Sequence, residues 1–337
     1  MKRLIIRLLS EKQYRSIRHF FQKIRLKHEL KQCYKYDLSR YYCNNATVNE
    51  SSSSLLSKIV KEYHALEKGL TMPDFRLGFG RALVLSLINH CIEYSQRYDS
   101  SNKQLIHAVS VVLEYDFVHI ESQNILDNLL KQKIEELRSC NISSVSSIQR
   151  DTSSKDLFSF IDSPFPQFAN SRCSVRNFSN EEIPMERLNA AIELARSTPS
   201  SCNRQCWRTY VFTDKAKINQ ILDIQGGSRG FGHLTNKLVV IVSETSVFSA
   251  SSERNQMFVD GGIYTMNLLY CLHYYQIAAC TLNCCFNVDI DKQLRKICGI
   301  KESEVFVAML SCGIPQNFFK VAYSKRVDIE CTNRVIK

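Results

Sequence analysis

The stretch QMFVDGGIYTMNLLYCLHYYQ, residues 256–276, is apolar around nearly its whole circumference when it is drawn as a helix. A helix that is apolar on every side has to be buried, because none of its faces is suited to water. We therefore expect this helix at the centre of a domain, with neighbouring segments of the chain packed around it.

Short apolar segments with strand character lie on both sides of this helix. They are WRTYVFT at 207–213, KLVVIVSE at 237–244, IAACTLNC at 277–284 and EVFVAMLSCG at 304–313. Between and before them, helical periodicity predicts helices over 181–198, 214–224 and 288–300. This mixed order predicts an α+β fold, with a three-layer core around the central helix.

The first half of the chain has helical periodicity and no strand signal. Helices are expected over 54–70, 81–98, 102–120 and 122–140, after a loop at 41–54. The Ser-rich, polar segment 141–156 is interpreted as the linker between the two halves. The predicted domains are a basic amphipathic helical tip at 1–40, a helical domain at 41–150 and an α+β domain at 151–337.

Charge and cysteine content exclude several classes of protein. The net charge is +11, but residues 1–36 alone hold eleven Lys or Arg and two Glu, so the rest of the chain is close to neutral. Nucleic-acid binding by the body of the protein is therefore not indicated. The fourteen cysteines are scattered and none has C-x-x-C spacing, which favours reduced thiols in a cytoplasmic protein and predicts no metal site.

The basic tip permits two interpretations. Its apolar residues recur with broken helical spacing, and they are Leu4, Ile5, Leu8, Leu9, Ile17, Phe20, Phe21 and Ile24. Arg7 interrupts the first apolar stretch and no cleavage site follows, so we expect neither a signal peptide nor a spanning helix. The tip either makes peripheral contact with an anionic membrane on its inner face, through residues 1–36, or packs on the body of the protein.

The loop EYHALEKGLTMPDFRLGFG, residues 62–80, is the most distinctive motif of the helical half. It gathers His64, Glu67, Lys68 and Arg76 near three glycines. A role in capping and turning the chain is favoured here over a catalytic role. Gly69 is expected to end the helix before it.

Two polar stretches of the second half carry a candidate site. SRCSVRNF, residues 171–178, places Arg172 and Arg176 on either side of Ser174, and guanidinium groups so close together suit a phosphate. TPSSCNRQCW, residues 198–207, is a polar turn between a helix and a strand, where Ser201 and Asn203 can point at a ligand.

Together, RCSVRNF and PSSCNRQCW resemble motifs of the FMN-dependent nitroreductase-like flavoproteins, and the resemblance extends over about 170–330. The central helix, QIAACTLNCC, MLSCGIPQ and AYSKRVDIE agree with later family segments in the expected order. The resemblance implies a nitroreductase-like domain and a homodimer whose interface includes the central helix. Cys206 departs from the family, which has proline there, and the short segment 225–236 implies a pocket that is open or closed by the N-terminal half.

The resemblance also implies which residues hold FMN. Arg172 and Arg326, helped by Ser174, correspond to the phosphate binders, and Arg176 to the cation near the pyrimidine edge of the ring. Asn203 corresponds to an amide that hydrogen-bonds the ring, while backbone groups of Leu282, Asn283 and Cys284 fall on the N5 side. Cys173 and Ser201 complete the expected set of cofactor contacts, and no catalytic acid or base is expected.

The implied function is that of an FMN-dependent oxidoreductase. NADH or NADPH would supply hydride, and a small organic acceptor would receive the electrons by a ping-pong mechanism. The alternative is a flavin-fold accessory or scaffold protein at a membrane-associated assembly. Extended relatives with an EKGL…GFG-like first half are associated with surface-polysaccharide production.

Three smaller features receive conservative interpretations. GGSRGFG, residues 226–232, follows a helix and precedes a strand, which is the wrong context for a dinucleotide-binding turn. Cys202 and Cys206 are interpreted as buried, inert thiols. His273 is interpreted as a satisfied core residue.

Overall fold

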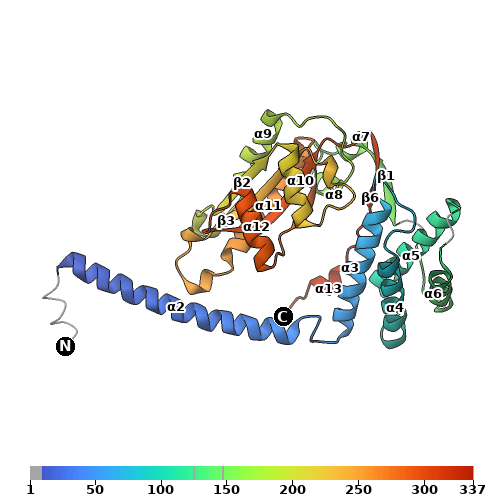
Figure 1. The fold of residues 1–337 in the computed structure, drawn as a ribbon, viewed down its shortest axis with the longest axis horizontal. Helices are drawn as coiled ribbons and strands as arrows, with labels where there is room; N and C mark the ends of the chain where they lie inside the picture. The colour runs from blue at the N-terminus through green and yellow to red at the C-terminus, as the bar shows by residue number, and fades with distance from the viewer. Residues whose placement is uncertain (1–9, 124–125, 146–147, 337) are drawn as a thin grey trace.

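The computed structural model describes residues 10–123, 126–145 and 148–336, and it contains a helical half and an α+β half (Figure 1). In the helical half, four helices pack around one core. They are α3 (Ser52–Leu70), α4 (Arg81–Arg97), α5 (Lys103–Glu121) and α6 (Asn128–Ser139). Capping side chains fix where three of these helices begin, because Ser51, Asn102 and Asp127 each accept a hydrogen bond from a first-turn backbone N–H.

Two glycines of the motif of the helical half turn the chain between α3 and α4. Gly78 and Gly80 have positive φ angles of 74° and 68°, and the Gly78 N–H donates a hydrogen bond to His119 Nε2 at 2.7 Å. The expected helix end at Gly69 was wrong, since α3 continues to Leu70. Gly69 is instead required by packing, because a Cβ there would lie 2.2 Å from the Phe79 ring.

The N-terminal helix α2 (Glu11–Asn44) is longer than the sequence predicted and projects away from the body of the protein (Figure 1). It runs through the first part of the loop expected at 41–54, since no Gly or Pro interrupts the segment. Arg254 pairs with Asp37 at 2.6 Å, and Ser251 in the short helix η4 (Ser251–Glu253) donates a hydrogen bond to Glu29. Apart from these contacts, the helix is largely exposed.

The α+β half is built on a four-stranded antiparallel sheet with the order β2-β3-β5-β4. Its strands are β2 (Trp207–Phe212), β3 (Lys237–Glu244), β4 (Ala278–Asn283) and β5 (Glu304–Gly313). Strand β3 is buried along Lys237–Ser243, so both faces of the sheet are covered. Val239 of β3 and Thr281 of β4 both pair with Leu310 of β5, which sets the register of these three strands.

Helices cover both faces of this sheet and complete the three layers. The central helix α11 (Gln256–Tyr274) packs on one face with α9 (Met185–Ala195), while α10 (Lys215–Gln225) and α12 (Val288–Cys298) pack on the other. Trp207 stacks on Tyr264 of α11, with ring centroids 4.8 Å apart. The α+β fold around a central helix, preceded by an all-helical region, is therefore confirmed.

The linker expected at 141–156 was wrong in its second part. Residues 149–153 form strand β1 (Gln149–Ser153), which pairs antiparallel with β6 (Phe318–Ala322). Helices α7 (Ser154–Leu157) and α8 (Phe165–Ser171) follow, and α13 (Ile329–Thr332) lies near the end of the chain. Short 3-10 turns complete the described elements: η1 (Ser201–Asn203), η2 (Gly232–Leu234) and η3 (Thr245–Val247).

The β1–β6 ribbon lies beside α3 and so connects the two halves (Figure 1). Within the described residues, no helix combines the length and the apolar character needed to cross a membrane. The interpretation of residues 1–9 as neither signal peptide nor anchor lies outside the described residues.

Candidate functional site

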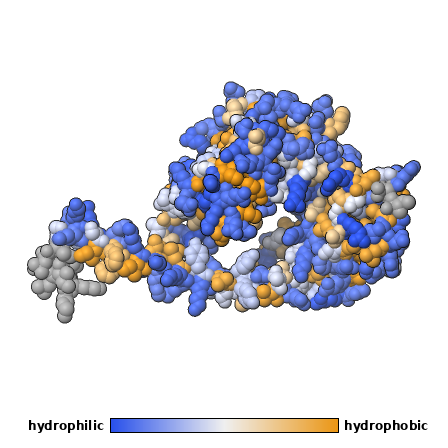
Figure 2. All heavy atoms as spheres, viewed as in Figure 1, coloured by the Kyte–Doolittle hydropathy of each residue, from blue (hydrophilic) through white to orange (hydrophobic). Residues whose placement is uncertain are grey.

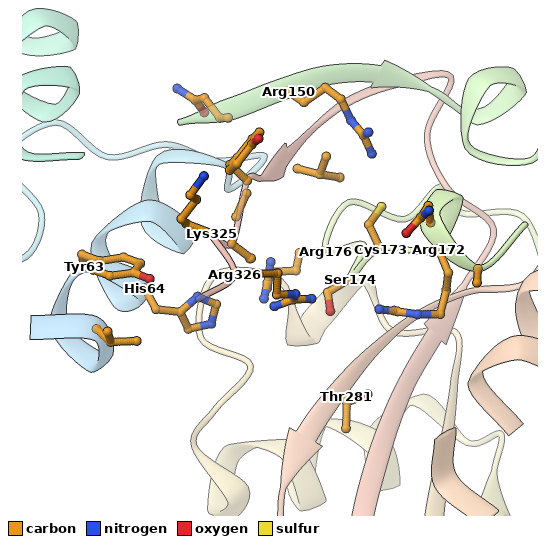
Figure 3. A pocket seen from close by; sticks show the side chains of 18 of the residues that line it. Tyr63, His64, Arg150, Arg172, Cys173, Ser174, Arg176, Thr281, Lys325 and Arg326 are labelled. Atoms are coloured by element: carbon orange, nitrogen blue, oxygen red, sulfur yellow. The ribbon is translucent and has the colours of Figure 1, made fainter. Parts of the chain in front are cut away.

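A cavity of about 1260 Å³ lies where the helical half meets the α+β half (Figure 3). Helix α3 contributes Tyr63 and His64, and the β1–β6 ribbon with the segment after it forms a second wall. The segment 172–176 forms a third wall, and Thr281 of β4 also lines the cavity. Its volume exceeds that of an ordinary small-ligand pocket, which is about 300–1000 Å³.

The walls of this cavity are strongly cationic. Among the described residues, five Lys or Arg and one carboxylate, that of Asp151, line it; the five cations are Arg150, Arg172, Arg176, Lys325 and Arg326. Within the described part of the chain, none of the five forms an ion pair with a carboxylate. Their positive charge is therefore available to a ligand.

Arg172 and Arg176 are held in place by the backbone between them. The Val175 N–H donates to the carbonyl oxygen of Ala279 at 3.1 Å, and Val175 itself is buried, which ties this segment to β4. Only 8% of Arg176 is exposed. The Nε atoms of Arg172 and Arg176 are buried and have no hydrogen-bond partner among the described residues. A buried guanidinium with unsatisfied donors is costly unless an anion compensates it, so this geometry suits an anionic ligand.

The titratable side chains discussed next, which lie near Arg172 and Arg176, are neutral or cationic at neutral pH. Burial, with the nearby charge of Arg172, lowers the pKa of His273 to about 4, and its Nε2 lies 2.7 Å from Ser171 Oγ. His273 is thus an uncharged core residue at neutral pH, as the sequence indicated. Burial, together with the charges of Arg176 and Arg229, lowers the pKa of Lys68. Burial raises the pKa of the Cys173 and Cys280 thiols, so neither is a ready thiolate.

The predicted cofactor contacts divide into two groups. Arg172, Cys173, Ser174, Arg176 and Arg326 line the cavity together. The other predicted contacts lie outside the cavity lining, and they are Ser201, Asn203, Leu282, Asn283 and Cys284. Leu282 is in the core, and the Asn283 carbonyl accepts a hydrogen bond from Gln225 Nε2.

The turn that holds Ser201 and Asn203 has an unusual backbone. Cys202, Asn203 and Gln205 have φ angles of 52°, 55° and 47°, which are strained for residues other than glycine. The Ser201 N–H, at 3.2 and 3.3 Å from the carboxylate oxygens of the buried Asp260, anchors the turn to α11. Asn203 is exposed, and so is Cys202, so the expectation that Cys202 is a buried thiol was wrong.

Sequence reasoning did not identify several lining residues. Lys325 adjoins the predicted Arg326, and a run of two cations was a usable signal for it. Arg150 lies within the expected linker, and Tyr63 and His64 lie on a helix whose position against the cavity is a tertiary feature. No local pattern in the sequence marks these three residues as part of one site.

The fold and this cavity define an α+β protein with a cationic cavity beside an all-helical region. Residues 169–228 match the model of the nitroreductase family, so the predicted resemblance is confirmed in the second half of the chain. No curated protein matches the chain.

Solved structures with a similar arrangement cover about half of the chain. An FMN-dependent nitroreductase from Clostridium difficile is 20% identical with a TM-score of 0.41, covering 46% of this chain and 90% of its own. A nitroreductase family protein from Streptococcus pneumoniae is 15% identical with a TM-score of 0.44. The match covers 51% of this chain and 100% of that protein. A nitroreductase family protein from Clostridium novyi is 18% identical with a TM-score of 0.40. The match covers 46% of this chain and 86% of that protein.

Proposed function

We propose that the cavity binds FMN and that the protein is an FMN-dependent oxidoreductase, which accepts hydride from NADH or NADPH and passes electrons to a small organic acceptor. The observation that carries this proposal is the pair of cavity-lining arginines, Arg172 and Arg176, whose buried Nε atoms have no hydrogen-bond partner among the described residues. Their segment lies inside the match to the nitroreductase family.

The residues present fit the phosphate end of FMN. A phosphate dianion accepts paired, charge-assisted hydrogen bonds from guanidinium groups. Arg172 and Arg326 approach the cavity from different segments of the chain, and Ser174 adds a hydroxyl donor between them (Figure 3). The cavity volume leaves room for a second molecule beside the mononucleotide, as two half-reactions at one site require.

When bound, FMN supplies the hydride chemistry, and the protein contributes orientation and charge. Arg176 places a fixed positive charge in the cavity, where it stabilises negative charge that develops on a reduced ligand. His273 stays neutral and the neighbouring thiols stay protonated, so they do not oppose this charge arrangement. The helical half contributes Tyr63 and His64 to the lining of the cavity.

We further propose that the protein is a homodimer through α11. Exposed apolar residues lie along this helix at spacings that suit one helical face, and they form a stripe of Val259, Ile263, Met266 and, two turns further on, Tyr274. Met266 also lines the cavity, so a second copy packed on the stripe would border the site. Such a partner is the simplest source for the predicted contacts from Ser201 and Asn203, which the cavity of one subunit lacks.

The redox reaction can be tested by anaerobic titration of the flavin-loaded protein. Addition of NADPH or NADH should bleach the yellow flavin absorption, and a quinone or nitroaromatic acceptor should restore it. Flavin-loaded protein that neither donor bleaches would contradict the oxidoreductase assignment while leaving FMN binding intact.

A membrane-associated accessory role is the second candidate, and the exposed face of α2 favours it. Ile17, Phe20, Phe21 and Ile24 lie on one side of the helix and are 43–63% exposed, as the apolar stripe in Figure 2 illustrates. Lys12, Arg15, Arg18 and Lys23 occupy the other side. A colourless protein that sediments with anionic phosphatidylglycerol vesicles, and loses this binding in F20E/F21E, would support this role over the first.

A further inference from the structure

Glu67, on the inner face of α3, is a fully buried carboxylate that joins the two halves of the protein. Its Oε1 accepts a hydrogen bond from the backbone N–H of Ser324 at 2.9 Å and lies 3.1 Å from His107 Nε2. Its other oxygen lies 3.7 Å from His64 Nδ1. Burial raises the pKa of Glu67, but the hydrogen bonds from His107 and Ser324, together with the nearby His64, outweigh burial and set the pKa at about 2. Glu67 is therefore ionised at neutral pH.

The helical half makes further contacts to the same C-terminal segment. Gln104 Nε2 donates a hydrogen bond to the carbonyl oxygen of Lys325 at 3.3 Å, and Tyr63 donates its hydroxyl to Gln104 Oε1. At the surface, Lys103 pairs with Asp328 at 2.9 Å. Ser324 itself has a φ angle of 51°, an unfavourable conformation for a residue with a side chain. The contacts from α3 and α5 thus hold the backbone in a shape that it would not adopt alone.

The residues that follow Ser324 are cavity residues. Lys325 and Arg326 line the cavity together with Arg176 and Ser174 (Figure 3). Arg326 is attached to a short segment after β6, and the described residues offer its side chain no carboxylate partner. Its position therefore depends on the backbone of this segment, which Glu67 and Gln104 fix.

We propose that Glu67 is a positioning residue for the anion site: by fixing Ser324, it places the Lys325–Arg326 pair where Arg326 meets the phosphate of the flavin. This inference rests on the proposed binding of FMN. It assigns the EKGL motif of the helical half to the cofactor site of the α+β half. It also gives the helical half a direct role in cofactor affinity.

Riboflavin distinguishes positioning from a purely structural role, because it has the flavin ring and no phosphate. In E67A, the affinity for FMN should fall about tenfold, which corresponds to the loss of one charge-assisted contact, while the affinity for riboflavin stays unchanged. E67Q keeps an oxygen acceptor for the Ser324 N–H and should recover most of the FMN affinity. Fluorescence quenching of each flavin on titration with protein measures both constants.

Glu62 provides a matched control on the same helix. It accepts a hydrogen bond from Ser86 and pairs with His90, so it too is a partly buried carboxylate beside a histidine, but all these contacts stay inside the helical half. E62A should leave the ratio of FMN to riboflavin affinity unchanged. In flavin-free protein, hydrogen exchange at the Ser324 amide should be faster in E67A and unchanged in E62A.

Each outcome has a defined meaning. If E67A bound FMN and riboflavin more weakly by the same factor, or if its Ser324 amide exchanged at the wild-type rate, the positioning role would be overturned. If E67A does not fold, Q104A removes the second backbone contact. That variant too must lower the affinity for FMN and leave the affinity for riboflavin unchanged. If the wild-type protein binds neither flavin, the proposed function fails, and the exchange rate of Ser324 alone then decides whether Glu67 fixes this segment.

Discussion

Replacement of Arg176 by methionine should have opposite effects on the flavin-free and the flavin-bound protein. Arg176 is buried, its Nε has no hydrogen-bond partner among the residues that the structure describes, and Lys68 lies close enough for their like charges to interact. Without an anion, this guanidinium is an uncompensated buried charge. Methionine has a similar length, fills the space and needs no partner.

The expected magnitudes follow from these contacts. Removal of a buried, unsatisfied polar group raises the free energy of unfolding of a protein by about 1–3 kcal/mol. Flavin-free R176M should therefore be more stable than the wild type by about that amount. FMN at a hundred times its dissociation constant stabilises the wild type by about 2.7 kcal/mol. In R176M this gain should shrink to less than about half, because a favourable charge has been removed from the site.

Chemical unfolding with and without saturating FMN measures both effects. R18M, on the exposed face of α2, is the control, and it should change neither the flavin-free stability nor the gain from FMN. A flavin-free R176M that is less stable than the wild type would refute the reasoning, because Arg176 would then be satisfied by the protein itself.

Two further predictions concern pH and assembly. The pKa of about 4 for His273 lies below its ordinary value of 6.5, so the unfolded chain binds a proton that the folded protein excludes. The free energy of unfolding should therefore fall, by up to about 3 kcal/mol, as the pH falls from 6.5 to 4, and H273Q should flatten the profile in that window. I263E, in the exposed stripe of α11, should yield monomers in sedimentation velocity, whereas V288E on the exposed part of α12 should not. A wild-type protein that is already monomeric would contradict the dimer.

The sequence predicted the elements whose signal is local. The strands β2, β3, β4 and β5 are short apolar runs, and α11 is apolar on nearly all sides, so burial could be inferred without knowing the partners. Strand β1 could not be predicted in this way. Its sequence, QRDTS, is polar, and it is a strand only because β6 pairs with it from the other end of the chain.

The site shows the same division between local and tertiary signals. Arg172, Arg176 and Arg326 were predicted through the family resemblance, and the fold brings them to one cavity. Arg150 and His64 reach that cavity only because the ribbon and α3 pack against each other. The hydrogen bond between Glu67 and Ser324 spans 257 positions, and a sequence pattern contains no information about such a pairing.

The absorption spectrum of freshly purified protein tests the central claim most directly. Wild-type protein should carry bound FMN and be yellow, R172A/R326A should be colourless, and R15A/R18A should match the wild type, because those arginines lie on the distant helix α2. If R172A/R326A retained the full flavin content, the cationic cavity would not be the FMN site.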